Sequence, residues 1–232
     1  MTITADHGYD DLPRLMSLMT GDEKHDFAAT STLDVLWVLY DQVLDVTPER
    51  AEATDRDRFL LSKGHGPMAY YAVLAAKGFV PEEWLPGFGA YDSPLGHHPD
   101  RVLVPGAEIG SGSLGHGLPL AVGSALGLRA QGLTDPAVWV LIGDAELDEG
   151  SNHEAIAYAG AAGLDRLHTV VVDNASASHA LPGGIAARFE AANWSTATVD
   201  GRDHAALYEA FTTPHPGRPH AVVARVEPKN AR

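Results

Sequence analysis

Two uninterrupted apolar runs in the second half of the chain constrain its fold most strongly. Residues 138–142 read VWVLI and residues 169–172 read TVVV, which is typical of strands buried on both faces of a sheet. A helical pattern at residues 151–162 lies between them, and residues 196–199 and 221–226 are further candidate strands. Strand–helix–strand units of this kind form right-handed crossovers between parallel strands. We therefore predict an α/β fold with a mostly parallel sheet and helices on both faces.

The first half of the chain carries weaker patterns. Residues 1–27 are polar and weakly patterned, so residues 1–30 are predicted to be a loose lead-in to one domain that spans residues 31–232. A helix is predicted to begin at Ser31 as its N-cap, because the apolar residues that follow share one helical face. Residues 67–77 are predicted to form a second helix, opened by a proline.

Three further segments are predicted to contain loops. Residues 48–58 are charged, and residues 80–105 are rich in Pro and Gly. A loop as long as the second one is more often functional than merely connecting. Residues 106–132 are predicted to form a Gly-rich loop that leads into a helix of small residues from Leu118. This segment has neither the lysine of a Walker loop nor the preceding strand of a dinucleotide fingerprint.

Composition limits the functions to be considered. The 232 residues include 31 acidic and 16 basic side chains, and the resulting net charge of −15 argues against nucleic-acid binding. The apolar stretches are too short to span a bilayer, and the first residues lack the pattern of a secretory signal. The absence of cysteine excludes thiolate metal sites and cysteine nucleophiles. We expect a cytoplasmic protein that binds neither nucleic acid nor membranes.

Polar residues follow two of the predicted strands at their carboxyl ends, where ligands gather in parallel sheets. Gly143 and Asp144 follow the first apolar run, and Asp173 and Asn174 follow the second. On adjacent strands, the side-chain oxygens of Asp144 and Asn174 would lie close together and suit a hard cation such as Mg²⁺. Asp and Asn also form turns after strands without binding a ligand, so the residues alone leave both interpretations open.

An acidic cluster follows Asp144 and leads into the next predicted helix; its members are Glu146, Asp148, Glu149 and Glu154. Interaction with the helix macrodipole accounts for part of this cluster. It does not account for acidic residues beside the end of a buried strand. The cluster is therefore a candidate part of a site.

Three histidines lie next to glycine: His65 in SKGHG, His97 in GHHP and His116 in GHG. Glycine lets a ligand or a backbone approach closely, and histidine exchanges protons near neutral pH. A zinc site with three histidines is an alternative. Their spacing does not match the pair of histidines that a zinc protease carries on one helix.

Five motifs, taken together and in order, resemble one family. They are SKGHG at residues 62–66, GH at 96–97, GSLG at 112–115, GDxxLxEG at 143–150 and DN at 173–174. The arrangement resembles the thiamine-diphosphate-binding half of transketolase, and the resemblance covers nearly the whole chain. It implies the diphosphate-binding type of fold found in thiamine diphosphate enzymes. It also implies two cofactors: thiamine diphosphate and Mg²⁺, or another divalent cation such as Ca²⁺ or Mn²⁺.

The resemblance implies roles in cofactor binding for individual residues. Asp144, Asn174 and the backbone carbonyl of Ser176 would bind the cation. His65 would contact the diphosphate. Backbone groups at Ala145 and Glu146, beside Gly143, would donate to phosphate. The backbone of the Gly-rich loop would hold the aminopyrimidine; the loop positions concerned are Gly112, Ser113 and Leu114.

The resemblance also implies catalytic residues on the substrate side. His25 and His97 would join His65 as the histidines around the substrate, where they can hydrogen-bond a carbonyl or hydroxyl and move protons. Glu149 would belong to a carboxylate network that couples two active sites, with Glu154 at a neighbouring acidic position. The cofactor supplies the electron sink, so the protein has to anchor it and orient the substrate.

Several positions depart from the family pattern. His25 is followed by bulkier residues than the usual Gly-Gly, Ala145 replaces Gly, His98 replaces Pro, and His116 replaces Gln. The chain also stops at Arg232, before any pyrimidine-binding domain. We therefore expect one subunit of a split transketolase, in an α2β2 assembly with a separate C-terminal subunit that carries this domain. The assembly would move a two-carbon ketol unit between small sugar or keto substrates.

Two alternatives stay open. A relative of the keto-acid dehydrogenases would pass the two-carbon unit to the thiol of a lipoyl group or an acyl carrier protein. A noncatalytic regulatory homologue would bind no substrate, and the presence of Asp144, Asn174 and His65 argues against it.

Overall fold

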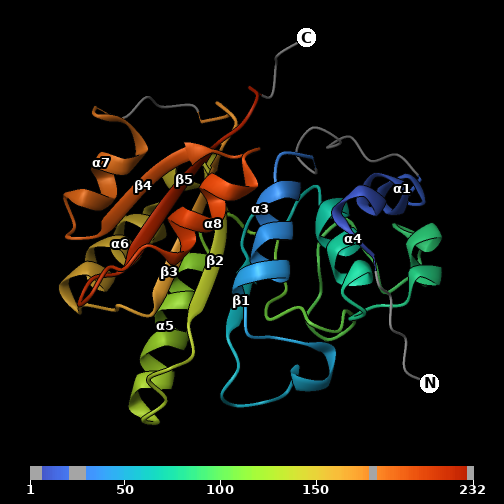
Figure 1. Cartoon of the computed structure of the whole chain (residues 1–232), viewed down its shortest axis with the longest axis horizontal. Helices are drawn as coiled ribbons and strands as arrows, with labels where there is room; N and C mark the ends of the chain where they lie inside the picture. Colours follow the sequence, from blue (N-terminus) through green and yellow to red (C-terminus); the bar gives the residue numbers. More distant parts are fainter. Residues whose placement is uncertain (1–6, 21–29, 178–181, 229–232) are drawn as a thin grey trace.

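A parallel sheet forms the centre of the fold. The computed structural model describes residues 7–20, 30–177 and 182–228. Over these residues five strands pair in the order β1-β2-β3-β5-β4, and every pairing is parallel (Figure 1). They are β1 (Arg58–Leu61), β2 (Val138–Gly143), β3 (Leu167–Asp173), β4 (Ser195–Asp200) and β5 (His220–Arg225). The predicted α/β fold with a parallel sheet is confirmed.

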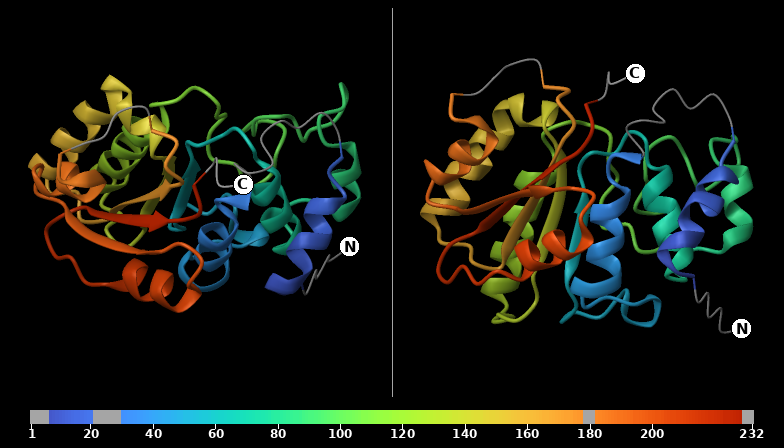
Figure 2. Two further views of the ribbon diagram at one scale, coloured as in Figure 1. Left: turned by 90° about the horizontal axis from the view of Figure 1, so that it is seen from above. Right: turned by 45° about the horizontal axis from the view of Figure 1, so that its top comes forward.

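Helices cover both faces of the sheet, as predicted (Figure 2). Alternate residues of a strand face opposite layers: Val140 and Ile142 pack in one apolar core, whereas Trp139 and Leu141 pack in the other. The first core includes residues of α5 (Gly117–Ala130), α6 (Gly150–Ala161) and α7 (Gly184–Glu190). The second includes residues of α1 (Leu12–Ser17), α3 (Leu33–Val38), α4 (Met68–Ala76) and α8 (His204–Thr212). Burial of β2 and β3 on both faces explains why their sequences are apolar without alternation.

Short helical turns complete the described part of the chain: η1 (Tyr9–Asp11), η3 (Pro48–Arg50), η4 (Glu82–Gly87) and η5 (Ala145–Asp148) are 3₁₀ helices, and η2 (Leu39–Val43) is a π-helix. The long segment at residues 80–105 contains η4 and is otherwise irregular, as predicted. No helix within the described ranges is long and apolar enough to cross a bilayer.

The first half of the structure differs from the prediction in three places. Part of the lead-in is structured, because α1 buries Leu12 and Leu15 completely in the core. The helix predicted after Ser31 is present, but it begins at Leu33, and its N-cap is Thr32 rather than Ser31. The charged loop ends in β1, a strand of only four residues whose apolar run is too short to stand out.

Candidate functional site

Asp144 follows β2 and is the centre of a hydrogen-bonded turn. Its side chain is buried, and its backbone N–H donates to the carbonyl of Val172 at 3.1 Å. Its carboxylate accepts the backbone N–H and the hydroxyl of Ser176, both at 2.6 Å, and the backbone N–H of Ala177 at 3.0 Å. The chain that leaves β3 therefore folds over the end of β2, so the two predicted strand ends are neighbours.

Asn174 lies within the turn that wraps Asp144. Its side chain is buried, and its Oδ1 atom accepts no hydrogen bond within the described part of the chain. An amide oxygen that is buried without a partner is energetically costly, and a hard cation would satisfy it. The carboxylate, the amide oxygen and the nearby backbone of Ser176 thus form a donor set that fits Mg²⁺ bound to phosphate.

A cavity of about 350 Å³ opens at this edge of the sheet. Asp144, Asp173 and Arg225 line it, together with Ala175 and Thr198. These residues lie at or just beyond the carboxyl ends of β2, β3, β4 and β5, where ligands bind in open parallel sheets.

Glu146 is turned away from this cavity. Its side chain is 1% exposed, and its carboxylate accepts hydrogen bonds from Ser62, Gly115 and Gly143. Burial raises the pKa of this carboxyl, and the hydrogen bonds from Ser62 and from the two backbone amides oppose that shift. The sequence indicated an acidic cluster but not the direction of this side chain. Ser62 is a contact that the sequence reasoning missed.

The Gly-rich loop lies close to Gly64 of the SKGHG motif and to His98, the residue directly after the GH motif. Gly112 has φ +124°, and a Cβ atom placed there would lie 2.6 Å from Cδ2 of His98. A Cβ atom on Gly64 would lie 2.6 Å from the backbone nitrogen of Gly112. The rings of His65 and His98 have centroids 6.3 Å apart. His98, noted from the sequence only as a departure, therefore lies beside His65 and the loop.

The predicted cofactor positions on this loop differ in exposure. Ser113 is exposed, whereas Gly112 and Leu114 are half-buried, as is His65. Ala145 is half-buried in η5, directly after Asp144. Ser62 and Gly115 both donate to Glu146, so the motifs at 62–66, 112–115 and 143–150 meet in one region of the structure.

The remaining candidate residues that the structure describes, His97 on the proposed substrate side among them, lie nearer the surface. His97 is exposed, and its ring packs against Phe88 at 5.3 Å between centroids. Glu149 is exposed at the start of α6, with its Cβ 2.7 Å from where a Cβ on Gly115 would lie. His116 is exposed directly before α5. Glu154 is exposed on α6 and Asp148 is half-buried in η5, whereas His25 lies outside the described residues.

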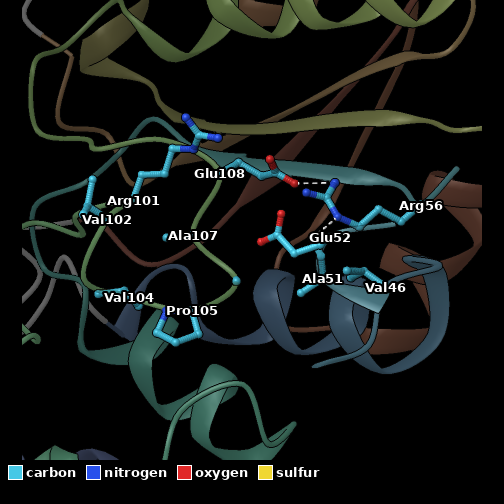
Figure 3. A pocket seen from close by; sticks show the side chains of 11 residues that line it. Val46, Ala51, Glu52, Arg56, Arg101, Val102, Val104, Pro105, Ala107 and Glu108 are labelled. Carbon is cyan, nitrogen blue, oxygen red and sulfur yellow. Dashed lines mark hydrogen bonds and ion pairs between the residues drawn. The ribbon is translucent and has the colours of Figure 1, made fainter. Parts of the chain in front are cut away.

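A second cavity, of about 280 Å³, lies away from these residues, among the chain before β1 and the loop at 101–108. Figure 3 shows Arg56 extending toward Glu108 across it, and their closest atoms are 2.7 Å apart. None of the residues predicted to bind the cofactor lines it. Among the described residues, no group of three His, Cys, Asp or Glu side chains is arranged to hold a metal ion.

Comparisons with known proteins agree with the geometry. Residues 17–225 match the family described as "Transketolase, thiamine diphosphate binding domain". The chain is 57% identical over 224 residues to a protein named "Ferredoxin fas2" from Rhodococcoides fascians, covering 97% of this chain and 74% of that protein. It is 36% identical over 210 residues to a protein from Actinobacillus succinogenes that is named as one subunit of an apulose-4-phosphate transketolase, covering 86% and 75%.

Solved structures share the fold. Transketolase from Leishmania mexicana superposes with a TM-score of 0.79 at 24% sequence identity, over 94% of this chain and 36% of that one. The chain thus spans about a third of that enzyme's length. With the sequence match over residues 17–225, the chain belongs to the transketolase family, in which it corresponds to the thiamine diphosphate binding domain.

Proposed function

We propose that this chain is the diphosphate-binding subunit of a two-component, thiamine-diphosphate-dependent transketolase. The assembly would transfer a two-carbon ketol unit from a ketose or ketose phosphate donor to an acceptor. The observation that carries the proposal is the buried pair formed by Asp144 and Asn174 at two adjacent strand ends, in a domain that matches the thiamine diphosphate binding domain.

The cation would bind to Asp144, Asn174 and the carbonyl of Ser176. A carboxylate offers about four lone-pair positions, and three donors from Ser176 and Ala177 already use the Asp144 carboxylate. One position on Oδ1 stays available for a cation, and the unpartnered Oδ1 of Asn174 supplies a second oxygen. Mg²⁺ suits this partial set, because it retains phosphate and water oxygens; Ca²⁺ or Mn²⁺ would use the same oxygens.

The remaining cofactor contacts would come from backbone and histidine. His65, with the backbone at Gly143, Ala145 and Glu146, would bind the diphosphate. Backbone groups at residues 112–114 would hold the aminopyrimidine. When bound, thiamine diphosphate supplies the electron sink for breaking a carbon–carbon bond next to a carbonyl.

The exposed histidines would act on the substrate. His97 would donate a hydrogen bond to the ketol, and its packing against Phe88 limits the orientations of the ring. His25 would contact the substrate from the other side. Glu149 would join the carboxylate network between active sites, and its exposure at the start of α6 leaves it accessible to another chain.

A separate subunit would supply the pyrimidine-binding domain. Three relatives support this, because each is named as one subunit of a transketolase. The family resemblance implies that the glutamate that activates the aminopyrimidine lies in that domain. We therefore propose an assembly of two copies of each chain, with the cofactor between unlike chains.

Mixing the purified components tests the proposal. A separate chain that carries the pyrimidine-binding domain is expected to give ketol transfer and tight, Mg²⁺-dependent thiamine diphosphate binding only when it is combined with this chain. Calorimetry and a coupled assay would measure the two quantities. Turnover by this chain alone would overturn the two-component arrangement, and a mixture that binds no thiamine diphosphate would overturn the function.

A further inference from the structure

One buried carboxylate joins three segments that border the candidate site. Oε1 of Glu146 accepts the hydroxyl of Ser62 and the backbone N–H of Gly115, the latter at 2.9 Å. Oε2 accepts the backbone N–H of Gly143 at 3.3 Å. Ser62 follows β1, Gly115 belongs to the Gly-rich loop, and Gly143 ends β2. The contacts therefore connect segments that are far apart in the sequence.

Further hydrogen bonds hold Ser62 and Glu146 themselves in place. Ser62 Oγ also accepts the backbone N–H of Gly117 at 2.9 Å, at the point where the loop enters α5. The side-chain amide of Asn152 donates to the backbone carbonyl of Glu146 at 2.6 Å and so ties Glu146 to α6. Gly117 has no room for a side chain, since a Cβ atom there would lie 2.2 Å from Cβ of Ser62.

We propose that Glu146 is a positioning residue that holds the Gly-rich loop in its cofactor-binding conformation. The inference rests on the proposed function, and it concerns the side chain rather than the backbone of Glu146. Residues 112–114 would contact the aminopyrimidine, and they lie between the His98 contact at Gly112 and the Glu146 contact at Gly115. Glu146 would act through Gly115 and Gly117 without contacting the cofactor's reacting atoms.

Three substitutions separate this role from general stability. Glu146→Ala removes the acceptor for all three donors. Glu146→Gln retains one carbonyl oxygen, which can continue to accept from Ser62 and Gly115, but its amide group is a donor and cannot accept the N–H of Gly143. Ser62→Ala breaks the connection to Gly117 and leaves the direct bond from Gly115 to Glu146.

Hydrogen exchange on this chain gives a readout that needs neither cofactor nor partner. In Glu146→Ala, the Gly115 amide is expected to exchange roughly 10- to 100-fold faster, as for a lost hydrogen bond to a charged group. Glu146→Gln should keep Gly115 within about threefold of the wild-type rate. Ser62→Ala should accelerate Gly117 more than Gly115. Exchange at Gly115 that is unchanged in Glu146→Ala would overturn the proposal.

Cofactor affinity gives the second readout, with Asp57→Ala as the matched control. Asp57 also accepts two backbone N–H bonds, from Ala137 at 2.7 Å and Asp45 at 3.0 Å, but at the amino end of the sheet. In the assembled enzyme, Glu146→Ala should weaken thiamine diphosphate binding roughly 10- to 100-fold, with partial rescue in Glu146→Gln and no change in Asp57→Ala.

The outcomes of this second experiment are distinct. Equal losses in Glu146→Ala and Asp57→Ala would assign Glu146 a merely structural role, and equal losses in the Ala and Gln variants would also contradict the proposal. If the wild-type assembly binds no thiamine diphosphate, the proposed function fails, whereas the exchange rates still decide whether Glu146 positions the loop.

Discussion

Ser176 donates both its backbone N–H and its hydroxyl to the carboxylate of Asp144, and both distances are 2.6 Å. The carboxylate that we expect to bind the cation therefore also anchors the turn that contains Asn174. We therefore expect Asp144 to affect both the stability of the fold and cofactor binding, whereas substitutions at its neighbours should separate the two.

Asp144→Ala should abolish Mg²⁺-dependent thiamine diphosphate binding by the assembled enzyme. It should also lower the free energy of unfolding by about 2–4 kcal/mol, because three donors lose a charged acceptor. Ser176→Ala, which keeps the backbone N–H bond, should lower affinity less than about tenfold. Calorimetry and denaturant unfolding measure the two effects, and unchanged cofactor affinity in Asp144→Ala would contradict the metal assignment.

Asn174→Ala should lower cofactor affinity without lowering the stability of the fold. The Oδ1 atom of Asn174 makes no hydrogen bond to other described residues, so its loss should change the stability of the cofactor-free chain by less than about 1 kcal/mol. Mg²⁺-dependent affinity should fall about 100-fold or more, at least the loss typical of residues that only support metal ligands. A variant that retains its affinity would show that Asn174 merely forms the turn.

His97→Ala should lower turnover without weakening cofactor binding. Its side chain is exposed, with the ring against Phe88, and we propose that it contacts the substrate; loss of a positioned acid–base group costs roughly 10²–10⁴-fold in rate. Steady-state kinetics and calorimetry on the assembled enzyme measure the two quantities. If affinity for thiamine diphosphate fell in parallel with turnover, His97 would belong to the cofactor site.

Buried histidines should make the fold sensitive to acid. Burial holds the pKa of His168 well below its ordinary value and lowers the pKa of His220 to about 4, and the nearby His215 acts in the same direction. Between about pH 6.5 and 4 the unfolded chain therefore binds more protons, so stability falls as the pH falls. For His220 the loss reaches about 3 kcal/mol at pH 4, and above about pH 6.5 this contribution is constant.

Denaturant unfolding between pH 4.5 and 7.5 checks this prediction. His168→Phe keeps an aromatic ring against Trp139, on which His168 stacks at 4.0 Å, and removes one titrating group, so the slope below pH 6.5 should be smaller. His153→Gln, on the exposed side of α6, should keep the wild-type slope. Identical slopes in all three proteins would show that His168 does not contribute.

The sequence allowed the sheet to be predicted wherever a strand was long and apolar. β2 and β3 are buried on both faces, so their sequences are continuous apolar runs that predict strands directly. The apolar run of the four-residue β1 is too short to predict a strand. α1 was missed because its six residues include only a few apolar positions, and their burial depends on α4 and the rest of the core.

The sequence indicates which positions belong to the candidate site, but it does not indicate which side chains contact one another there. The order of strands brings Asp144 and Asn174 together, and that order follows from the strand–helix pattern. The inward direction of Glu146 depends on Ser62 and Gly115, which are distant in sequence. No local pattern encodes such a contact.

The lengths of the connections between strands also set the order in which parts of the candidate site can come together during folding. Only residues 144–166 separate β2 from β3, whereas residues 62–137 separate β1 from β2. Closing the longer connection costs more chain entropy and slows the pairing it permits. We expect β2 and β3 to pair early and bring Asp144 and Asn174 together. β1, and with it Ser62 and His65, would then dock last, so the proposed cation ligands would come together before His65 reaches the candidate site.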